Sequence, residues 1–337
     1  MDKVWNELLV FETLDLVKRH VRAKQGKNLS TTRALQISSN FIQGREYFKS
    51  AERANITVRP LLQYYGVMSL SKGLILMLNN MSLTENQLKH SHGLEVKNWK
   101  ETLASKNFED LLIVVRRGTF TELLDATRNV NFLKHNSSKA DYITPLSKPH
   151  QGYELVFKDV MQYFPDLHKE YELWLDKELV FAKLIELYFH AGDNKVLVHL
   201  EGEISQDNLG LLFPEKYCGQ LEMISRNRKE TLFKYDRNGW CPNIAQSSIS
   251  FLDIGTCCVV PVLKNDIGFN LLTSMYLISY VLGMMARYFP TTWISLMRAE
   301  KGDKIYPFIC RALDYIYDIY PKQILIFLNS MESIVKL

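Results

Sequence analysis

The stretch from Ile267 to Ala286 constrains the fold of this chain more than any other. It carries no charged residue over about twenty positions, which is near the length that an α-helix needs to cross a bilayer. Polar side chains such as Asn270, Ser274 and Tyr280 recur along it, however, and polar groups are costly in lipid. We therefore predict a helix buried in the core of a soluble protein, and no membrane association.

The length and composition are consistent with such a core. The chain has 337 residues, of which 47% are hydrophobic and 23% charged, an ordinary balance for a globular protein. This length suggests two domains, or one large domain with an appendage. The first residues, Met1 to Glu7, include acidic side chains and lack the apolar segment of a signal peptide, so we expect a cytoplasmic protein.

The five cysteines predict free thiols in a reducing compartment. Their number is odd, and no Cys-x-x-Cys pair occurs among Cys218, Cys241, Cys257, Cys258 and Cys310, whereas zinc sites usually show paired ligands. The sequence also lacks the P-loop, GxGxxG, GxSxG and HExxH motifs. We therefore expect no metal and no cofactor.

Helical periodicity dominates both ends of the chain. Apolar spacing predicts helices over 5–23, 33–54, 60–78, 270–288, 290–297, 306–317 and 321–333. The helix that follows Pro60 is apolar on most sides, as is typical of the central helix of a bundle. Gly66 and Gly73 are seven positions apart on one face of it, where they allow another helix to approach closely.

The middle of the chain changes to a strand pattern. Residues Lys195 to Glu201 alternate apolar and polar side chains, as a half-buried strand does. Weaker strand candidates at 220–224, 231–235, 248–252 and 257–263 predict a small antiparallel sheet between about 178 and 264. The fold class is thus α+β and predominantly α-helical. A helical N-terminal region (1–177) precedes the sheet and a C-terminal helical bundle (178–337), and both are expected to pack as one unit.

Two motifs resemble the YaaC-like family of bacterial proteins. The first runs from Arg59-Pro60-Leu61-Leu62-Gln63-Tyr64-Tyr65-Gly66 into Ser69–Gly73, with His92-Gly93-Leu94 downstream, and the second is Ala286-Arg287-Tyr288-Phe289-Pro290-Thr291-Thr292-Trp293. The resemblance spans residues 30 to 330 and implies no assigned activity.

We interpret the prominent residues of these motifs as structural. They are Arg59, Tyr64, Tyr65, His92, Arg287 and Trp293. An unpaired buried charge is very costly. Arg287 is therefore predicted to pair with a carboxylate or with helix carbonyls.

A weaker resemblance links the N-terminal half to HEPN helical domains. Many of these are ribonucleases of toxin–antitoxin and anti-phage systems, with an Arg-x(4–6)-His motif. Arg128 and His135 fit the loosest of these spacings. The resemblance implies that they clamp a phosphate and act as general base or acid. The alternative is a surface arginine and a histidine in a loop.

Two basic clusters are candidate nucleic-acid contacts. The first comprises Lys18, Arg19, Arg22 and Lys24, and the second Arg226, Arg228 and Lys229. Cations are also favoured at a helix C-terminus and on a solvated hairpin, so both clusters have a purely structural alternative. His90 and His92 are two apart, and ordinary hydrogen bonding is favoured over metal ligation there.

These observations lead to three hypotheses. The first is a non-catalytic binding or assembly subunit with a protein partner or a homo-oligomeric state, in a bacterial anti-phage defence or stress system. The second is a HEPN-like ribonuclease that uses Arg128 and His135. The third is a nucleic-acid-binding protein, whose affinity would fall steeply with salt.

Overall fold

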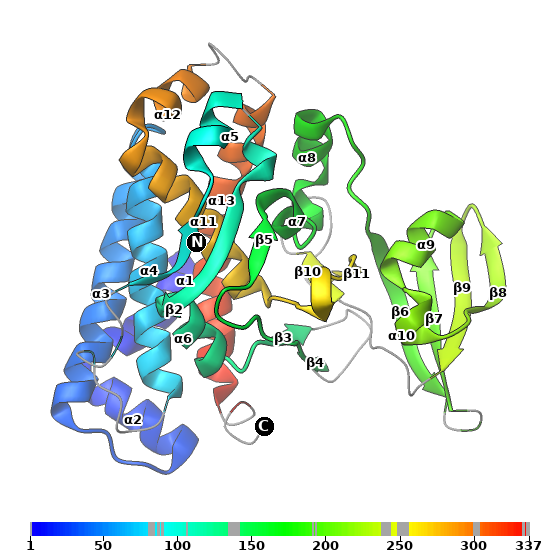
Figure 1. Cartoon of the computed structure of the whole chain (residues 1–337). Helices are drawn as coiled ribbons and strands as arrows, with labels where there is room; N and C mark the ends of the chain where they lie inside the picture. Colours follow the sequence, from blue (N-terminus) through cyan, green and yellow to red (C-terminus); the bar gives the residue numbers. More distant parts are fainter. Residues whose placement is uncertain are drawn as a thin grey trace.

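The computed structural model describes residues 2–79, 85, 88, 91–105, 107–133, 142–190, 192, 194–236, 244–247, 256–298, 304–331 and 334. They form a large helical body and a smaller six-stranded sheet with two short helices (Figure 1). We call residues 182–259 the sheet module and the rest the helical body. The prediction of a mostly helical α+β fold with small antiparallel sheets is confirmed.

The helical body is built around α4 (Arg59–Leu78), whose side chains are buried on most sides. Three long helices pack against it: α3 (Thr31–Arg53), α11 (Leu271–Tyr288) and α13 (Ile305–Asn329). One hydrophobic core therefore joins both ends of the chain, from Trp5 to Ile334. In Figure 1 the blue N-terminal helices and the red α13 lie in the same part of the molecule.

Two glycines let α3 and α4 approach closely. A Cβ added at Gly66 would lie 2.6 Å from Cδ2 of Phe48, and one added at Gly73 would lie 2.8 Å from Cε2 of Phe41. Neither distance is compatible with real side chains, so the aromatic rings of α3 occupy the space that any larger residue would need. The helix that approaches the face of α4 carrying Gly66 and Gly73 is therefore α3.

Shorter elements complete the body. The helices are α1 (Asp2–Leu8), α2 (Leu14–Gln25), α5 (Trp99–Ser105), α6 (Thr119–Ala126), α7 (Phe157–Met161), α8 (His168–Leu175) and α12 (Pro290–Met297). The strands are β1 (His92–Val96), β2 (Leu112–Gly118) and β5 (Glu154–Val156), paired in the order β1-β2-β5, and the hairpin of β3 (Val130–Leu133) and β4 (Tyr142–Pro145).

The sheet module has its own small core. Its antiparallel strands β6 (Ala182–His190), β7 (Lys195–Glu201), β8 (Glu222–Asn227), β9 (Glu230–Asp236), β10 (Ile244–Ser247) and β11 (Thr256–Val259) follow the order β10-β11-β6-β7-β9-β8. Helices α9 (Gln206–Leu212) and α10 (Glu215–Cys218) cover one face. Val198 and Phe233 on that face are fully buried.

The described residues of the module contact the body through β10 and α10. Strand β10 packs against the 3-10 helix Pro165–Leu167, and the hydroxyl of Tyr217 donates a hydrogen bond to Asp266. In Figure 1, β10 and β11 lie next to the body, whereas β9 and β8 lie farthest from it.

Several predicted elements differ in their bounds. The predicted first helix is interrupted at Thr13, whose backbone is extended. The two predicted C-terminal helices form one helix, α13, which continues through Pro321. Cys218, Cys257, Cys258 and Cys310 are free thiols. Cys241 and the strand expected at 248–252 lie outside the described residues.

The buried uncharged helix is confirmed, because α11 is buried from Leu271 to Met285. Among the described residues, one helix, α4, is long and apolar enough to cross a membrane. Of that apolar window, 72% is buried inside the fold. Its hydropathy therefore reflects its place in the core.

Candidate functional site

The motif residues of distant segments meet where α4, β1 and α11 come together. The hydroxyl of Tyr64 on α4 lies 2.6 Å from Nδ1 of His92, the first residue of β1. The hydroxyl of Tyr276 on α11 donates to the carbonyl oxygen of His92 at 3.0 Å, and that of Tyr280 donates to the carbonyl oxygen of Leu94 at 2.9 Å. Tyrosine hydroxyls therefore hold both the backbone and the ring of His92.

Small residues make this arrangement possible. Gly93 has a φ of +82°, and a Cβ there would lie 2.7 Å from the backbone nitrogen of Phe120. A Cβ on Gly283 would lie 2.8 Å from Cβ of Tyr64. The glycine of the His-Gly-Leu motif thus turns the backbone, and Gly283 lets α11 close onto Tyr64.

His92 lies in a partly buried, cationic environment. Burial lowers the pKa of its imidazole, and the positive charges of Arg287 and Lys72 lower it further. Burial and these charges therefore favour the neutral form of the ring. Because Tyr276 donates its proton to the backbone, the nearest acceptor for the Tyr64 proton is Nδ1 of His92, at 2.6 Å, whereas the Tyr276 oxygen lies at 3.4 Å. We infer that Nδ1 accepts and that Nε2 carries the ring proton.

Arg287 was expected to pair with a carboxylate or with helix carbonyls. The structure places it exposed at the end of α11, where its Nη1 donates to the hydroxyl of Tyr65 at 2.9 Å. Its guanidinium also lies 5.0 Å from the centre of the Tyr288 ring. Because Arg287 reaches solvent, it does not need the carboxylate that a buried arginine requires.

Arg59 and Trp293 tie helices together. The Nη2 atom of Arg59 lies 2.7 Å from a carboxylate oxygen of Asp314, which connects α4 to α13. The indole nitrogen of Trp293 donates to the carbonyl oxygen of Ile56 at 3.3 Å. These contacts join the start of α4 to the C-terminal helices.

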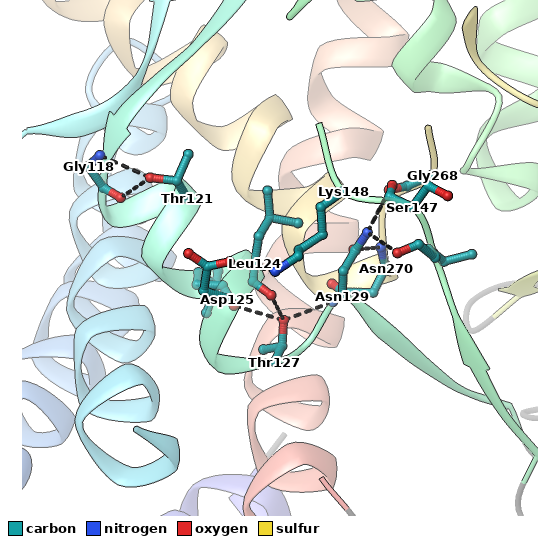
Figure 2. A network of polar contacts seen from close by, with 12 residues as sticks. Gly118, Thr121, Leu124, Asp125, Thr127, Asn129, Ser147, Lys148, Gly268 and Asn270 are labelled. Atoms are coloured by element: carbon teal, nitrogen blue, oxygen red, sulfur yellow. Dashed lines mark hydrogen bonds and ion pairs between the residues drawn. The ribbon is translucent and has the colours of Figure 1, made fainter. Parts of the chain in front are cut away.

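Arg128 lies in a turn whose neighbours are structural. Arg128 and Asn129 both have positive φ, of 51° and 48°, and Arg128 is exposed whereas Asn129 is fully buried. Asn129 donates to the carbonyl oxygen of Gly268 at 2.8 Å, and Asn270 donates to the hydroxyl of Thr127 at 3.2 Å (Figure 2). The network fixes the start of α11. His135 lies outside the described residues, so the ribonuclease hypothesis stays a prediction.

The two basic clusters lie far apart. Lys18, Arg19, Arg22 and Lys24 are on α2 of the body, whereas Arg226, Arg228 and Lys229 are at the turn between β8 and β9. Figure 1 shows these elements at opposite sides of the molecule. Phe233 and Tyr235, which follow the second cluster in sequence, are buried in the core of the module and cannot stack on a base. The described residues of the two clusters therefore do not form one continuous surface.

The sheet module carries a second candidate surface. On the face opposite α9 and α10, Tyr188 pairs with Leu197 and Leu232 pairs with His199 across neighbouring strands. Tyr188 is 51% exposed, whereas Leu197 and Leu232 are partly buried. We call this side of β6, β7 and β9, which carries Tyr188, Leu197, His199 and Leu232, the open face. This face was not predicted from the sequence, because neither β6 nor the two covering helices was predicted.

No group of three His, Cys, Asp or Glu side chains in the described part of the chain is arranged to hold a metal ion. His90 lies outside the described residues. The aromatic partners Tyr276 and Tyr280 were also missed as site residues, although their spacing of four places both on one face of a helix.

Comparison with known proteins identifies the family. The sequence model of the YaaC-like protein family matches residues 11–328, which is nearly the whole chain, so the chain belongs to this family. No curated protein and no solved structure matches it significantly.

Proposed function

We propose that this member of the YaaC-like family is a non-catalytic binding or assembly subunit of the bacterial cytoplasm, which binds another protein through the open face of its sheet module. The observation that carries the proposal is the unequal covering of the six-stranded sheet. Helices α9 and α10 bury one face, while the other face exposes Tyr188 beside the partly buried Leu197. Tyrosine is enriched in protein interfaces, and Tyr188 lies beside apolar neighbours on this face.

The charges around this face favour a protein over a nucleic acid. Lys183 lies 3.0 Å from Glu201, and Lys195 lies 3.9 Å from Glu222. His199 lies 2.9 Å from Glu230. Nucleic-acid binding depends on cations that neutralise phosphates. On this face, Lys183 and Lys195 already lie next to carboxylates. A surface on which apolar side chains lie among compensated charges suits a protein partner.

The outer edge of the module supports the same proposal. Strand β8 has most of its side chains exposed on both faces, including Met223 at 40% and Ile224 at 49%. An irregularity between Met223 and Ser225 shifts its pairing with β9. Bulges of this kind protect sheet edges against indiscriminate pairing, so the partner is expected to bind the face of the sheet.

The test compares Tyr188→Asp with Leu173→Asp. Leu173 on α8 is 51% exposed, as Tyr188 is, so both variants place a new carboxylate on an exposed apolar site. Each protein is purified from its host for mass spectrometry and an absorbance ratio at 260 and 280 nm, and is sedimented at micromolar concentration.

We expect the wild-type chain to sediment as an oligomer or to recover a stoichiometric protein, and Tyr188→Asp to lose this association. Leu173→Asp is expected to keep it. A wild-type monomer without a stoichiometric partner would overturn the proposal. Co-purified nucleic acid would favour the nucleic-acid hypotheses instead, and Arg128→Ala and His135→Ala would then be assayed for loss of RNA cleavage.

A further inference from the structure

We propose that a cleft between α1, α3 and α13 binds an aromatic amino acid, whose ammonium group pairs with Glu52 and whose carboxylate pairs with Lys49. The cleft belongs to the helical body, whereas the open face belongs to the sheet module. The proposal therefore goes beyond the protein-binding role proposed above and does not depend on it.

The cleft is a cavity of about 440 Å³ in which distant parts of the chain meet. Its walls come from α1 and the 3-10 helix Leu9–Glu12, from α3, and from α13. They include Trp5, Leu9, Arg45, Lys49, Glu52 and Tyr317. Small-molecule sites have volumes of roughly 300–1,000 Å³ and combine apolar walls with a few polar groups. A cavity at the lower end of this range suits a ligand as small as one amino acid.

Two aromatic rings form much of the apolar wall. The centre of the Trp5 ring lies 5.5 Å from that of Phe48, and the centre of the Tyr317 ring lies 6.0 Å from it. Phe48 is fully buried in the core, so it supports both rings from below the cleft. Aromatic rings attract one another beyond the effect of buried area, and the walls therefore favour an aromatic ligand over an aliphatic one.

Two residues of α3 bring opposite charges to the cleft. Lys49 and Glu52 are three positions apart, a spacing at which ion pairs form on helices. In the part of the chain that the structure describes, however, Lys49 has its carboxylate partner in Glu46, at 4.0 Å, and Glu52 forms no ion pair. The positive and the negative group of the cleft are therefore separate, as the two charges of a zwitterion require.

The ammonium group of Lys49 is available to a ligand, whereas the guanidinium of Arg45 is not. Arg45 lies 2.7 Å from Glu12 and 3.2 Å from Glu46, and the first of these pairs ties the 3-10 helix to α3. The Lys49 side chain is 53% exposed. An exposed pair at 4.0 Å contributes little, so its ammonium can turn to the carboxylate of a ligand.

The hydroxyl of Tyr317 orients Glu52. Burial raises the pKa of the Tyr317 phenol, and its hydrogen bond to Glu52 raises it further. The phenol therefore keeps its proton and donates a hydrogen bond to the carboxylate. The carboxylate oxygens have further lone pairs for a ligand's ammonium group, and aromatic faces beside them also attract a cation.

A ligand with a single charge would match the cleft less well. An organic anion would meet the carboxylate of Glu52, and an organic cation would meet the ammonium of Lys49. Like charges repel each other. An aromatic amino acid offers an opposite charge to each of them and a ring to the aromatic wall.

The experiment titrates the full chain with four compounds by calorimetry. L-Phenylalanine has all three features, 3-phenylpropionate lacks the ammonium group, phenethylamine lacks the carboxylate, and glycine lacks the ring. The variants are Glu52→Gln and Lys49→Gln. Glu101→Gln and Lys100→Gln on α5 are the matched controls, because they make the same changes at exposed positions outside the cleft. Thermal unfolding of each variant checks that it folds.

We expect L-phenylalanine to bind more tightly than the three other compounds. Glu52→Gln should weaken its binding by about tenfold, as the loss of a charge-assisted hydrogen bond does, without weakening that of 3-phenylpropionate. Lys49→Gln should weaken the binding of L-phenylalanine by a similar factor, without weakening that of phenethylamine. A variant that only disturbed the fold would weaken all of these ligands alike. The two control variants should bind as the wild-type chain does.

Any of three results would overturn the proposal. The first is that L-phenylalanine does not bind. The second is that 3-phenylpropionate, phenethylamine or glycine binds as tightly as L-phenylalanine does. The third is that Glu52→Gln and Lys49→Gln change binding no more than Glu101→Gln and Lys100→Gln do. None of these measurements involves the sheet module, so their failure would leave the comparison of Tyr188→Asp with Leu173→Asp unaffected.

Discussion

The helical body and the sheet module differ in where the glycines of their helices lie. In the body, a Cβ added at Gly44, Gly66, Gly73 or Gly283 would come within 2.8 Å of a neighbouring side chain. In the module, a Cβ added at Gly210 of α9 would meet no atom within 4 Å. The helices of the body therefore pack against one another at these glycines, whereas Gly210 lies on the solvent-exposed side of α9.

The two cores also differ in size and connection. The body's hydrophobic cluster runs from Trp5 to Ile334, whereas that of the module is confined to residues 182–259. Among the described residues, the module contacts the body through β10 and α10. Local unfolding follows such divisions, so the module is expected to open without the body.

The largest expected effect comes from truncating one aromatic side chain in each core. Phe41→Ala and Phe233→Ala remove side chains that are at most 1% exposed, and each should cost about 3–5 kcal/mol. Phe41→Ala should lower the protection of amide hydrogens throughout the body, and Phe233→Ala only that within the module. Hydrogen exchange read by mass spectrometry measures both. Equal loss of protection in both regions for both variants would show that they unfold as one unit.

Two glycine substitutions are expected to change the free energy of unfolding by smaller amounts, and in opposite directions. Gly73→Ala should destabilise the body by about 1–3 kcal/mol, because the new methyl group meets the ring of Phe41. Gly210→Ala should stabilise the module by about 0.5–1 kcal/mol, because alanine is the better helix former and nothing obstructs it. Denaturant unfolding with a probe in each region measures both. A shift of stability in the same direction for both variants would contradict this difference between a tightly packed and an exposed glycine.

The sequence predicted the elements of the body better than those of the module, because of how each set of elements is buried. A helix that packs on several sides leaves a long apolar pattern, as in α4 and α11, and α3, α11 and α12 begin and end within two residues of the predicted bounds. The strands of the module bury one face, but in β9 that face carries Thr231 and Tyr235 as well as Phe233, so only Lys195–Glu201 gave a clear alternation of apolar and polar residues. Helix α13 was predicted in two parts because proline usually ends a helix, yet the chain continues through Pro321.

The candidate site was only partly predictable. The motifs singled out Tyr64, His92 and Arg287, but no local pattern shows that Tyr64 meets His92 or that Tyr276 reaches its carbonyl oxygen, because these contacts join residues up to 184 positions apart. Asn129 illustrates the same limit. No sequence pattern indicated that its side chain fixes the start of α11.

A pH effect is expected in the body. Burial lowers the pKa of His20 and of His92 below the ordinary value of 6.5. The unfolded chain therefore binds more protons than the native chain as the pH falls below about 6.5, so stability is full above that pH and decreases below it. Denaturant unfolding at pH 7.5 and 5.5 should show this loss, and His92→Asn should reduce it. An unchanged loss in His92→Asn would mean that other groups cause it.

The smallest effects are expected from exposed ion pairs, and here the two regions should not differ. Asp314 beside Arg59 in the body is 52% exposed, and Glu201 beside Lys183 in the module is 55% exposed. Exposed pairs contribute about 0–1 kcal/mol and are screened by salt. Asp314→Asn and Glu201→Gln, measured by denaturant unfolding at low and high salt, should each stay within this range. A loss of several kcal/mol in only one region would mean that ion pairs contribute differently to the stability of the body and of the module.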